Sequence, residues 1–262
     1  MGKNIIRQLD SGNHGVVFQI GDAAVKLFPN WDEDSLIVQM EIASNKQVME
    51  ILGTPIYKRY TLLHKDSKNV IKEIYGETLP VPGIRYILCN GKNLDDKLHE
   101  NNYLADTVFE KVLECLSAVL PRIWNRGYTH CDIKPDNIML CSEDASAKLI
   151  DFGSMTNPET KINDGRCTFV TEEYRVEYSE QGKKNIFEKY IKDVELQKRV
   201  EQHIDAFVAR KSELARRDHD VYAAMLTLFK IIGKSKPIRN LRKIHMLDSF
   251  VTKYASFRPS FE

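Results

Sequence analysis

Short hydrophobic runs next to turn signals dominate the first third of the chain. The polar, glycine-containing cluster 11–15 separates two such runs, which is the pattern of a β-hairpin, and Gly21-Asp22 predicts a second tight turn. A loop rich in proline and glycine is predicted over Gly76 to Gly83. The strand candidates are residues 5–6, 16–18, 23–28, Tyr57 to Leu63 and Arg85 to Leu88. This part of the chain is therefore expected to be β-rich.

The hydrophobic spacing becomes helical in four segments, namely Asp32 to Leu52, Asp106 to Asn125, Asn185 to Arg217 and Val221 to Ile232. The second segment is the clearest, because its apolar residues fall on one face and Gly127 follows its end. Pro121 predicts a bend or a turn near that end. The pattern predicts an α+β chain with a β-rich small lobe that holds one helix, a short connector at 89–92 and a mainly helical large lobe.

The overall charge is nearly balanced. The 262 residues carry a formal net charge of +1, which gives no global field that would favour nucleic acid or a membrane as a partner. Lysine and arginine gather between Lys230 and Lys243, and we interpret this run as a solvated helix face and loop. The five cysteines show no paired metal-type spacing. Because the sequence shows no secretory leader and no long apolar run, an intracellular location, cytoplasmic or nuclear, is expected.

The residues that carry chemistry are concentrated in two motifs, His130-Cys131-Asp132-Ile133-Lys134-Pro135-Asp136-Asn137 and Ile150-Asp151-Phe152-Gly153. Asp132 supplies a base for a hydroxyl group, and Lys134 supplies a cation for a phosphate. Asn137 and Asp151 supply hard oxygen ligands for a metal ion. This is the set of groups that phosphoryl transfer from a nucleotide requires.

In their order and spacing, the two motifs resemble the catalytic loop and the metal-binding turn of eukaryotic-type protein kinases. The resemblance implies a bilobal protein-kinase-like fold, with an N-lobe over 1–90 and a C-lobe over 91–262. It also implies ATP and Mg²⁺ or Mn²⁺ as cofactors, bound between the lobes, and a protein as substrate. Lys134 resembles the pattern of Ser/Thr-directed members, so an ATP-dependent Ser/Thr protein kinase is the expected function.

The resemblance extends to the first strands. Residues 9–17 are similar to the glycine-rich strand-turn-strand that covers the ATP phosphates, although Asp10 stands at the family's first glycine. Lys26 resembles the strand lysine that neutralises those phosphates, and Glu41 resembles the helix carboxylate that holds the lysine. Glu33 and Glu50 are competitors for that role. The nucleotide-binding residues that the resemblance implies are Gly12, Gly15, Val17, Ala24 and Lys26.

Further residues of the large lobe are similar to family positions. Thr171 resembles the substrate-docking end of the activation segment, close to the catalytic Asp-Lys pair. Asp220 resembles the aspartate with which the central helix anchors the catalytic-loop backbone. We interpret His130 as a packed residue that supports the loop. Glu177 and Arg258 are the candidate ion pair between the degraded closing motif of the segment and a late arginine motif.

Two departures from the family pattern change the expectations. Cys131 stands where many regulated kinases carry an arginine that receives an activation-loop phosphate, and cysteine has neither the charge nor the fork geometry for this. We therefore predict activity that does not depend on phosphorylation read at this position. A helical insertion is expected at about 179–217, packed on the large lobe as one or two helices; the alternative is a partner or dimer surface over 185–215.

Three functions remain open on the sequence. An active Ser/Thr protein kinase accounts for the complete catalytic set. A nucleotide-binding pseudokinase that acts as a scaffold would account for Asp10, the degraded motif at 176–178 and the insertion. A small-molecule phosphotransferase of related fold would account for the unusual large lobe, which is expected to be short after Ile232. In its compactness, the chain is similar to viral or bacterial-effector kinases. The retained catalytic residues favour the first.

Overall fold

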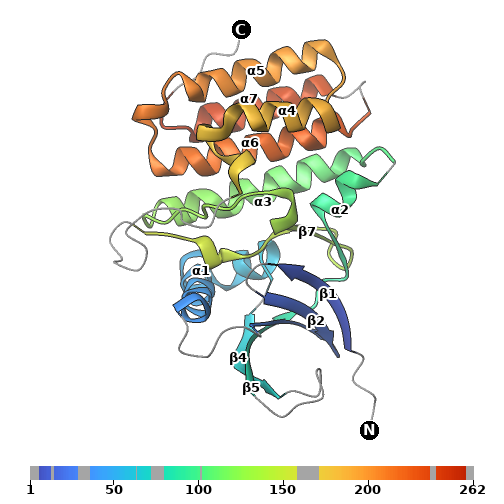
Figure 1. Ribbon diagram of the computed structural model, residues 1–262, viewed down its shortest axis with the longest axis vertical. Helices are drawn as coiled ribbons and strands as arrows, with labels where there is room; N and C mark the ends of the chain where they lie inside the picture. Colours follow the sequence, from blue (N-terminus) through green and yellow to red (C-terminus); the bar gives the residue numbers. More distant parts are fainter. Residues whose placement is uncertain are drawn as a thin grey trace. The chain divides into compact units, whose positions relative to one another are not determined.

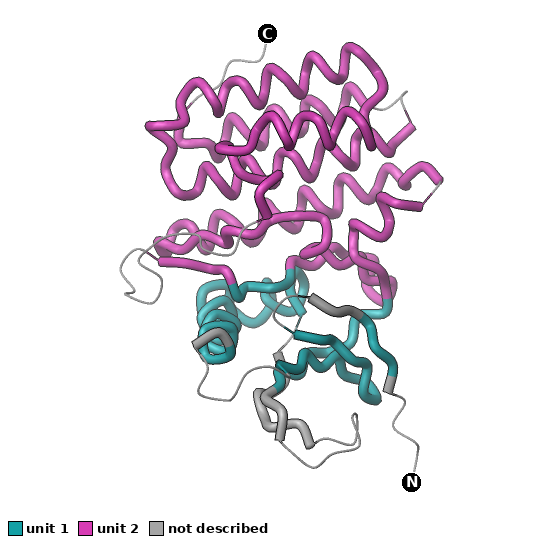
Figure 2. The backbone as a smooth tube through the Cα atoms, viewed as in Figure 1, with its two compact units in different colours: residues 1–90, 150–153 teal, residues 91–149, 154–262 magenta. Residues whose placement is uncertain are grey.

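The computed structural model describes residues 6–12, 15–28, 36–62, 64–71, 80–100, 102–157, 171–236 and 240–257. The chain divides into two compact units, which Figure 2 shows in different colours. Unit 1 comprises residues 1–90 and 150–153, and unit 2 comprises residues 91–149 and 154–262. The turn that carries Asp151 therefore belongs to unit 1, although it follows the last strand of unit 2 in the sequence.

Unit 1 is an antiparallel sheet with one helix (Figure 1). Its elements are β1 (Ile6–Gly12), β2 (Gly15–Ile20), β3 (Ala23–Leu27), α1 (Leu36–Tyr60), β4 (His64–Ile71) and β5 (Pro80–Ile87). The five strands lie in the order β1-β2-β3-β5-β4, and the antiparallel pairing of β1 with β2 and of β2 with β3 agrees with the two predicted tight connections. On β3, Val25 and Leu27 pack against Phe18 in the core, whereas the intervening Lys26 points to the opposite face, as the period of two requires.

The strand predicted from Tyr57 to Leu63 is wrong, because residues 57–60 form the last turn of α1. Gly53 has φ 69° and breaks the helix, and Pro55 lies at the start of the helical segment that follows. Proline is tolerated there because the first N–H groups of a helix have no partner within it. The strand predicted at Arg85 to Leu88 exists as β5, but it begins at Pro80, so residues 80–83 are strand and not loop.

Unit 2 contains a small sheet and six α-helices among the described residues. Its elements are β6 (Gly91–Asn93), α2 (Leu94–His99), α3 (Asp106–Trp124), β7 (Ile138–Cys141), β8 (Ala147–Leu149), α4 (Ser179–Lys189), α5 (Val194–Val208), α6 (Arg216–Gly233) and α7 (Asn240–Tyr254). Every residue of α6 from Asp220 to Ile232 is buried, because α3, α4, α5 and α7 all pack on it (Figure 1). In the parts of the chain that the structure describes, no helix combines the length and the apolar character needed to cross a membrane.

The segment predicted as an insertion folds into α4 and α5, and its apolar residues face inward. On α5, Leu196, Val200, Ile204 and Phe207 are buried at helical spacing. Exposed apolar side chains occur at the two ends of α5, at Val194 and Val208. This burial favours the interpretation as helices packed on their own unit, and a partner or dimer surface over 185–215 stays a prediction.

The basic run between Lys230 and Lys243 is not a solvated face at its two ends. Lys230 and Lys243 are each 4% exposed, and each forms an ion pair, with Glu173 at 2.6 Å and with Asp106 at 2.7 Å. The interpretation failed because lysine spacing along the sequence does not reveal a carboxylate that approaches from a distant segment. Each of these two lysines therefore links its own helix to a distant segment of unit 2.

Replacing Phe207 with alanine tests whether α5 belongs to the core. Its ring is fully buried and meets Tyr222 and Phe257 edge-on, with centroids 5.4 and 5.0 Å away. We expect Phe207→Ala to lower the free energy of unfolding by about 3–5 kcal/mol, measured by urea denaturation. The neighbouring Val208 is 39% exposed, so Val208→Ala is the control and should cost less than about 1 kcal/mol. Equal effects of the two variants would contradict the packing of α5.

Candidate active site

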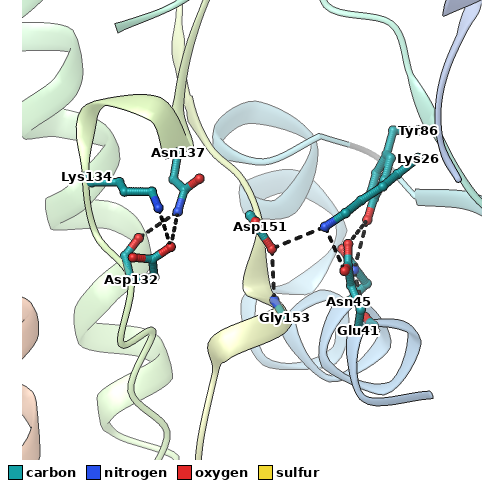
Figure 3. Close-up of polar contacts among 9 residues, drawn as sticks. All are labelled: Lys26, Glu41, Asn45, Tyr86, Asp132, Lys134, Asn137, Asp151 and Gly153. Atoms are coloured by element: carbon teal, nitrogen blue, oxygen red, sulfur yellow. Dashed lines mark hydrogen bonds and ion pairs between the residues drawn. The ribbon is translucent and has the colours of Figure 1, made fainter. Parts of the chain in front are cut away.

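The catalytic residues predicted from the sequence fall into two sets, one in each unit. In unit 1, Lys26 on β3 is the centre. Its Nζ lies 2.8 Å from Oε2 of Glu41 on α1 and 3.7 Å from Oδ1 of Asp151 (Figure 3). The lysine and the glutamate are almost buried, with 15% and 5% of their side chains exposed, while 41% of the Asp151 side chain is exposed. The helix, the strand and the turn thus bring three charged groups together.

Two residues that the sequence analysis missed support Glu41, one at its carboxylate and one at its backbone carbonyl. Tyr86 on β5 donates a hydrogen bond from its hydroxyl to Oε1 of Glu41 at 3.4 Å. Asn45 lies one helical turn after Glu41, and its Nδ2 donates to the Glu41 carbonyl at 2.8 Å and to the Tyr86 hydroxyl at 3.1 Å (Figure 3). The spacing of four residues was a usable signal for Asn45. No local pattern identifies Tyr86, which reaches the site only through strand pairing.

The electrostatics of this set follow from two carboxylates that share one ammonium group. Burial alone would lower the pKa of Lys26, but the nearby Asp151 and Glu41 carboxylates outweigh it and raise that pKa, so the lysine stays charged. Burial raises the pKa of Glu41, and the Lys26 ammonium offsets part of this effect. Burial and the Glu41 charge raise the pKa of Tyr86 well above its usual value, so it remains a donor. The set retains surplus negative charge, which suits a cation.

Asp151 occupies a tight turn. Its backbone has φ 60°, the left-handed region that aspartate tolerates better than most residues. The amide of Gly153 donates to Asp151 Oδ1 at 3.3 Å, and a Cβ at position 153 would lie 3.2 Å from that same oxygen. The turn therefore fixes the carboxylate while leaving part of it accessible to solvent.

In unit 2, Asp132 is the centre of a second set. Its Oδ2 lies 3.0 Å from Lys134 Nζ and accepts a hydrogen bond from Asn137 Nδ2 at 2.9 Å (Figure 3). Asn137 Nδ2 also donates to the Asp132 carbonyl at 2.8 Å, which closes the loop on itself. On the other side, Oδ1 accepts from the Thr171 hydroxyl at 3.1 Å, and Lys134 Nζ donates to that hydroxyl at 2.9 Å. Asp132, Lys134, Asn137 and Thr171 are thus brought together.

The loop before Asp132 is held by a buried carboxylate. Asp220 on α6 accepts hydrogen bonds from the backbone N–H groups of His130 at 2.8 Å and Cys131 at 2.9 Å, and from Trp124 Nε1 at 2.9 Å. Cys131 has φ 70°, so the chain turns sharply between these two amides and Asp132. His130 is fully buried, and its Nδ1 accepts from the Asp132 amide at 3.3 Å.

The predicted nucleotide-binding residues lie on the first three strands. Gly12 and Gly15 face each other across the hairpin, and Val17 pairs with Lys26. Ala24 lies one pleat before Lys26 and is buried. A Cβ on Gly15 would come within 2.5 Å of the Leu27 carbonyl, so glycine is required there by the close approach of β3.

Two of the predicted contacts involve residues that the structure does not describe. Arg258 lies outside the described residues, so the pair with Glu177 stays a prediction; Glu177 itself lies 3.4 Å from Arg175 Nε. Glu33, one competitor for the place of Glu41, also lies outside them. Glu50, the other competitor, is exposed on α1.

Comparison with known sequences supports the resemblance to protein kinases independently of the geometry. Residues 84–204 match the model of the protein kinase domain. The chain is similar to sperm motility kinase 2B of Mus musculus, with 35% identity over 78 residues, which cover 29% of this chain and 16% of that protein. It is also similar to the serine/threonine-protein kinase OXI1 of Arabidopsis thaliana, with 27% identity over 161 residues (58% and 37%). CBL-interacting protein kinase 14 of rice is 24% identical over 136 residues (51% and 31%).

The matched part of each of these relatives is less than two fifths of its length. The region that fits the domain model includes the loop at 130–137 and the Asp151 turn. The sheet with one helix in unit 1 and the helical unit 2 make up the bilobal α+β kinase fold. Together the fold and the sequence matches show that the chain is similar to the eukaryotic-type protein kinases.

Proposed function

We propose that the chain is an ATP-dependent Ser/Thr protein kinase that transfers the γ-phosphate to protein hydroxyl groups. The observation that carries the proposal is the contact of Asp132 with a cation and a hydroxyl group at once. The Thr171 hydroxyl lies 3.1 Å from the Asp132 carboxylate and 2.9 Å from Lys134 Nζ. A base and a phosphate-binding cation that meet at one hydroxyl group are what this reaction needs.

In this proposal the residues of unit 2 act on the acceptor. Asp132 orients the hydroxyl group and accepts its proton, which lies within the reach that general base catalysis requires. Lys134 balances the charge on the transferred phosphoryl group. Thr171 lies beside both and contributes to docking of the substrate segment. His130 and Asp220 keep the loop in place and do not touch the reactants.

The residues of unit 1, with Asn137, act on the nucleotide. Lys26, held by Glu41, pairs with phosphate oxygens, and the strands with Gly12, Gly15, Val17 and Ala24 supply backbone and apolar contacts to the nucleotide. Asp151 and the amide oxygen of Asn137 are hard ligands that fit Mg²⁺ or Mn²⁺, and the surplus negative charge around Lys26 and Asp151 favours a divalent cation. Bound metal supplies charge neutralisation at the phosphates.

The proposal includes activity without activation-loop phosphorylation read at position 131. Cys131 is 8% exposed, and its Sγ lies 3.3 Å from the hydroxyls of Thr129 and Thr156. A cysteine side chain has no guanidinium group, so residue 131 itself supplies no phosphate-binding cation.

Replacing Asp132 with asparagine tests the role of the base. We expect Asp132→Asn to lower the turnover number for transfer to a protein substrate by about 10²–10⁴-fold, because the amide accepts no proton. The Michaelis constant for ATP should change by less than about twofold, since this residue is not assigned to the nucleotide. Radiolabelled phosphate transfer measures both. Asp205→Asn, at an exposed position on α5, is the control and should behave as the wild type. Turnover of Asp132→Asn near the wild-type rate would refute the assignment.

Removing the metal, or its strongest protein ligand, tests the cofactor assignment. We expect transfer to stop on addition of EDTA and to return with excess Mg²⁺ or Mn²⁺. Asp151→Asn should raise the Mg²⁺ concentration needed for half-maximal turnover by roughly tenfold or more, because a charged oxygen ligand is lost. A titration of turnover against Mg²⁺ at saturating ATP measures this. An unchanged metal requirement in Asp151→Asn would contradict the assignment.

Treatment with a phosphatase tests the regulatory part of the proposal. We expect dephosphorylated protein, verified by mass spectrometry and freed of phosphatase, to retain its turnover within about twofold, because Cys131 has no charge to pair with a phosphate. Loss of transfer on dephosphorylation, and its recovery on rephosphorylation, would show that a phosphate is read elsewhere and would overturn this part.

A further inference from the structure

Lys230 is a buried cation on the central helix of unit 2. Lys230 is only 4% exposed, and burying an ammonium group is costly unless the group is paired. Its Nζ lies 2.6 Å from Glu173 Oε1 and 2.5 Å from the Tyr174 hydroxyl. The ammonium also stands over the rings of Tyr174 and Tyr190, 4.6 and 5.2 Å from their centroids. Lys230 is therefore held by several groups, and two of them are consecutive residues.

Glu173 is fixed from its other side as well. Asn185 on α4 donates a hydrogen bond from Nδ2 to Glu173 Oε2. Burial alone would raise the pKa of Glu173, but the hydrogen bond and charge of Lys230 lower it below its usual value, so the carboxylate is charged at neutral pH. The pair thus ties the segment around residue 173 to both α6 and α4, which Figure 1 shows next to each other.

This segment begins with Thr171. The Tyr174 amide donates to the Thr171 carbonyl at 3.0 Å, so residues 171–174 form one tight turn. Thr171 in turn bonds to Asp132 through both its hydroxyl, at 3.1 Å, and its amide, at 3.3 Å. A short, continuous path of contacts therefore leads from Lys230 through Glu173 and Tyr174 to Asp132.

The same helix holds the other side of Asp132. Asp220 binds the backbone at His130 and Cys131, and Lys230 follows ten residues later on α6. At 1.5 Å per residue the two anchors are about 15 Å apart along a buried, rigid helix. The loop before Asp132 and the turn that carries Thr171 are thus attached to one element, which sets their separation.

We propose that Lys230 and Glu173 are a positioning pair that holds the Thr171 turn against Asp132 and Lys134. Neither residue touches the reactants in this proposal. The consequence for turnover rests on the proposed kinase function, whereas the consequence for the Thr171 turn does not. Loss of the pair leaves Glu173 without its cation, and the turn then separates from Asp132 while α6 and the Asp220 anchor stay in place.

The chain offers a matched control in the second buried lysine. Lys243 on α7 has the same 4% exposure and pairs with Asp106 on α3 at 2.7 Å. This pair joins α7 to α3 and does not include a residue of the Thr171 turn. Lys243→Met therefore removes an equally buried ion pair without affecting the proposed path, and it reports the effect of lost stability alone.

Hydrogen–deuterium exchange of the full chain tests the positioning without any assay of activity. We expect Lys230→Met to speed exchange in peptides over 171–178 by roughly tenfold or more relative to wild type, because the turn opens locally. Lys243→Met should leave that region within about twofold of wild type and speed exchange in α3 and α7 instead. If Lys230→Met is too unstable to study, Glu173→Gln keeps the side-chain shape and should give a smaller increase at the same place. The proposal would be overturned if exchange over 171–178 were the same in Lys230→Met as in the control Lys243→Met. If Glu173→Gln is used in place of Lys230→Met, the same comparison with Lys243→Met applies.

Measurement of the turnover number then distinguishes the positioning role of the Lys230–Glu173 pair from the proposed kinase function. If the wild type transfers phosphate, Lys230→Met should lower the turnover number by on the order of tenfold to a hundredfold, because a shift of reacting groups by about 1 Å has an effect of this size. The Michaelis constant for ATP should change little. Lys243→Met should keep the wild-type turnover at a temperature where it is folded. Wild-type transfer that is unaffected by Lys230→Met would refute the positioning role alone. Absence of wild-type transfer would refute the kinase function, and the exchange result would still decide whether the pair holds the turn.

Discussion

The geometry of the catalytic loop depends on one buried carboxylate, that of Asp220, which accepts hydrogen bonds from two successive backbone amides and from Trp124. A carboxylate at 1% exposure is tolerated in a protein core only when such donors compensate for its lost hydration. In return, the donors fix the backbone where it turns sharply at Cys131. Asp132 follows directly, so the direction of its side chain is set by Asp220, a residue that lies 88 positions later in the sequence.

Paired charge organises both residue sets, but with different burial. In unit 1, Lys26 is shared by Glu41 and Asp151, and the exposed part of Asp151 leaves the surplus negative charge accessible. In unit 2, Lys134 is shared by Asp132 and the Thr171 hydroxyl, and deeper in the unit Lys230 meets Glu173. The accessible charges suit a metal and phosphates, whereas the buried pairs fix the backbone that carries them.

Much of this arrangement could be predicted from the sequence where the information is local. Asp132, Lys134 and Asn137 lie within six residues, and α3 and β3 follow clear periods of hydrophobicity. The contacts that the sequence did not predict join residues that lie far apart in the chain. Tyr86 on β5 reaches Glu41 on α1, 45 residues away in the sequence. Lys230 meets Glu173 across 57 residues, and its place in a basic run suggested a solvated face. Residues 57–60 were mistaken for a strand because the restart of the helix after Gly53 is not visible in their own pattern.

The central claim is that these residue sets transfer phosphate from ATP to serine or threonine. The most direct measurement incubates the purified chain with γ-labelled ATP, Mg²⁺ and a mixed panel of basic and acidic proteins, followed by phosphoamino-acid analysis. The account predicts labelled phosphoserine or phosphothreonine that depends on Mg²⁺. Absence of label on every protein, while ATP with Mg²⁺ still raises the melting temperature of the chain, would contradict it and would support a nucleotide-binding scaffold or a small-molecule phosphotransferase.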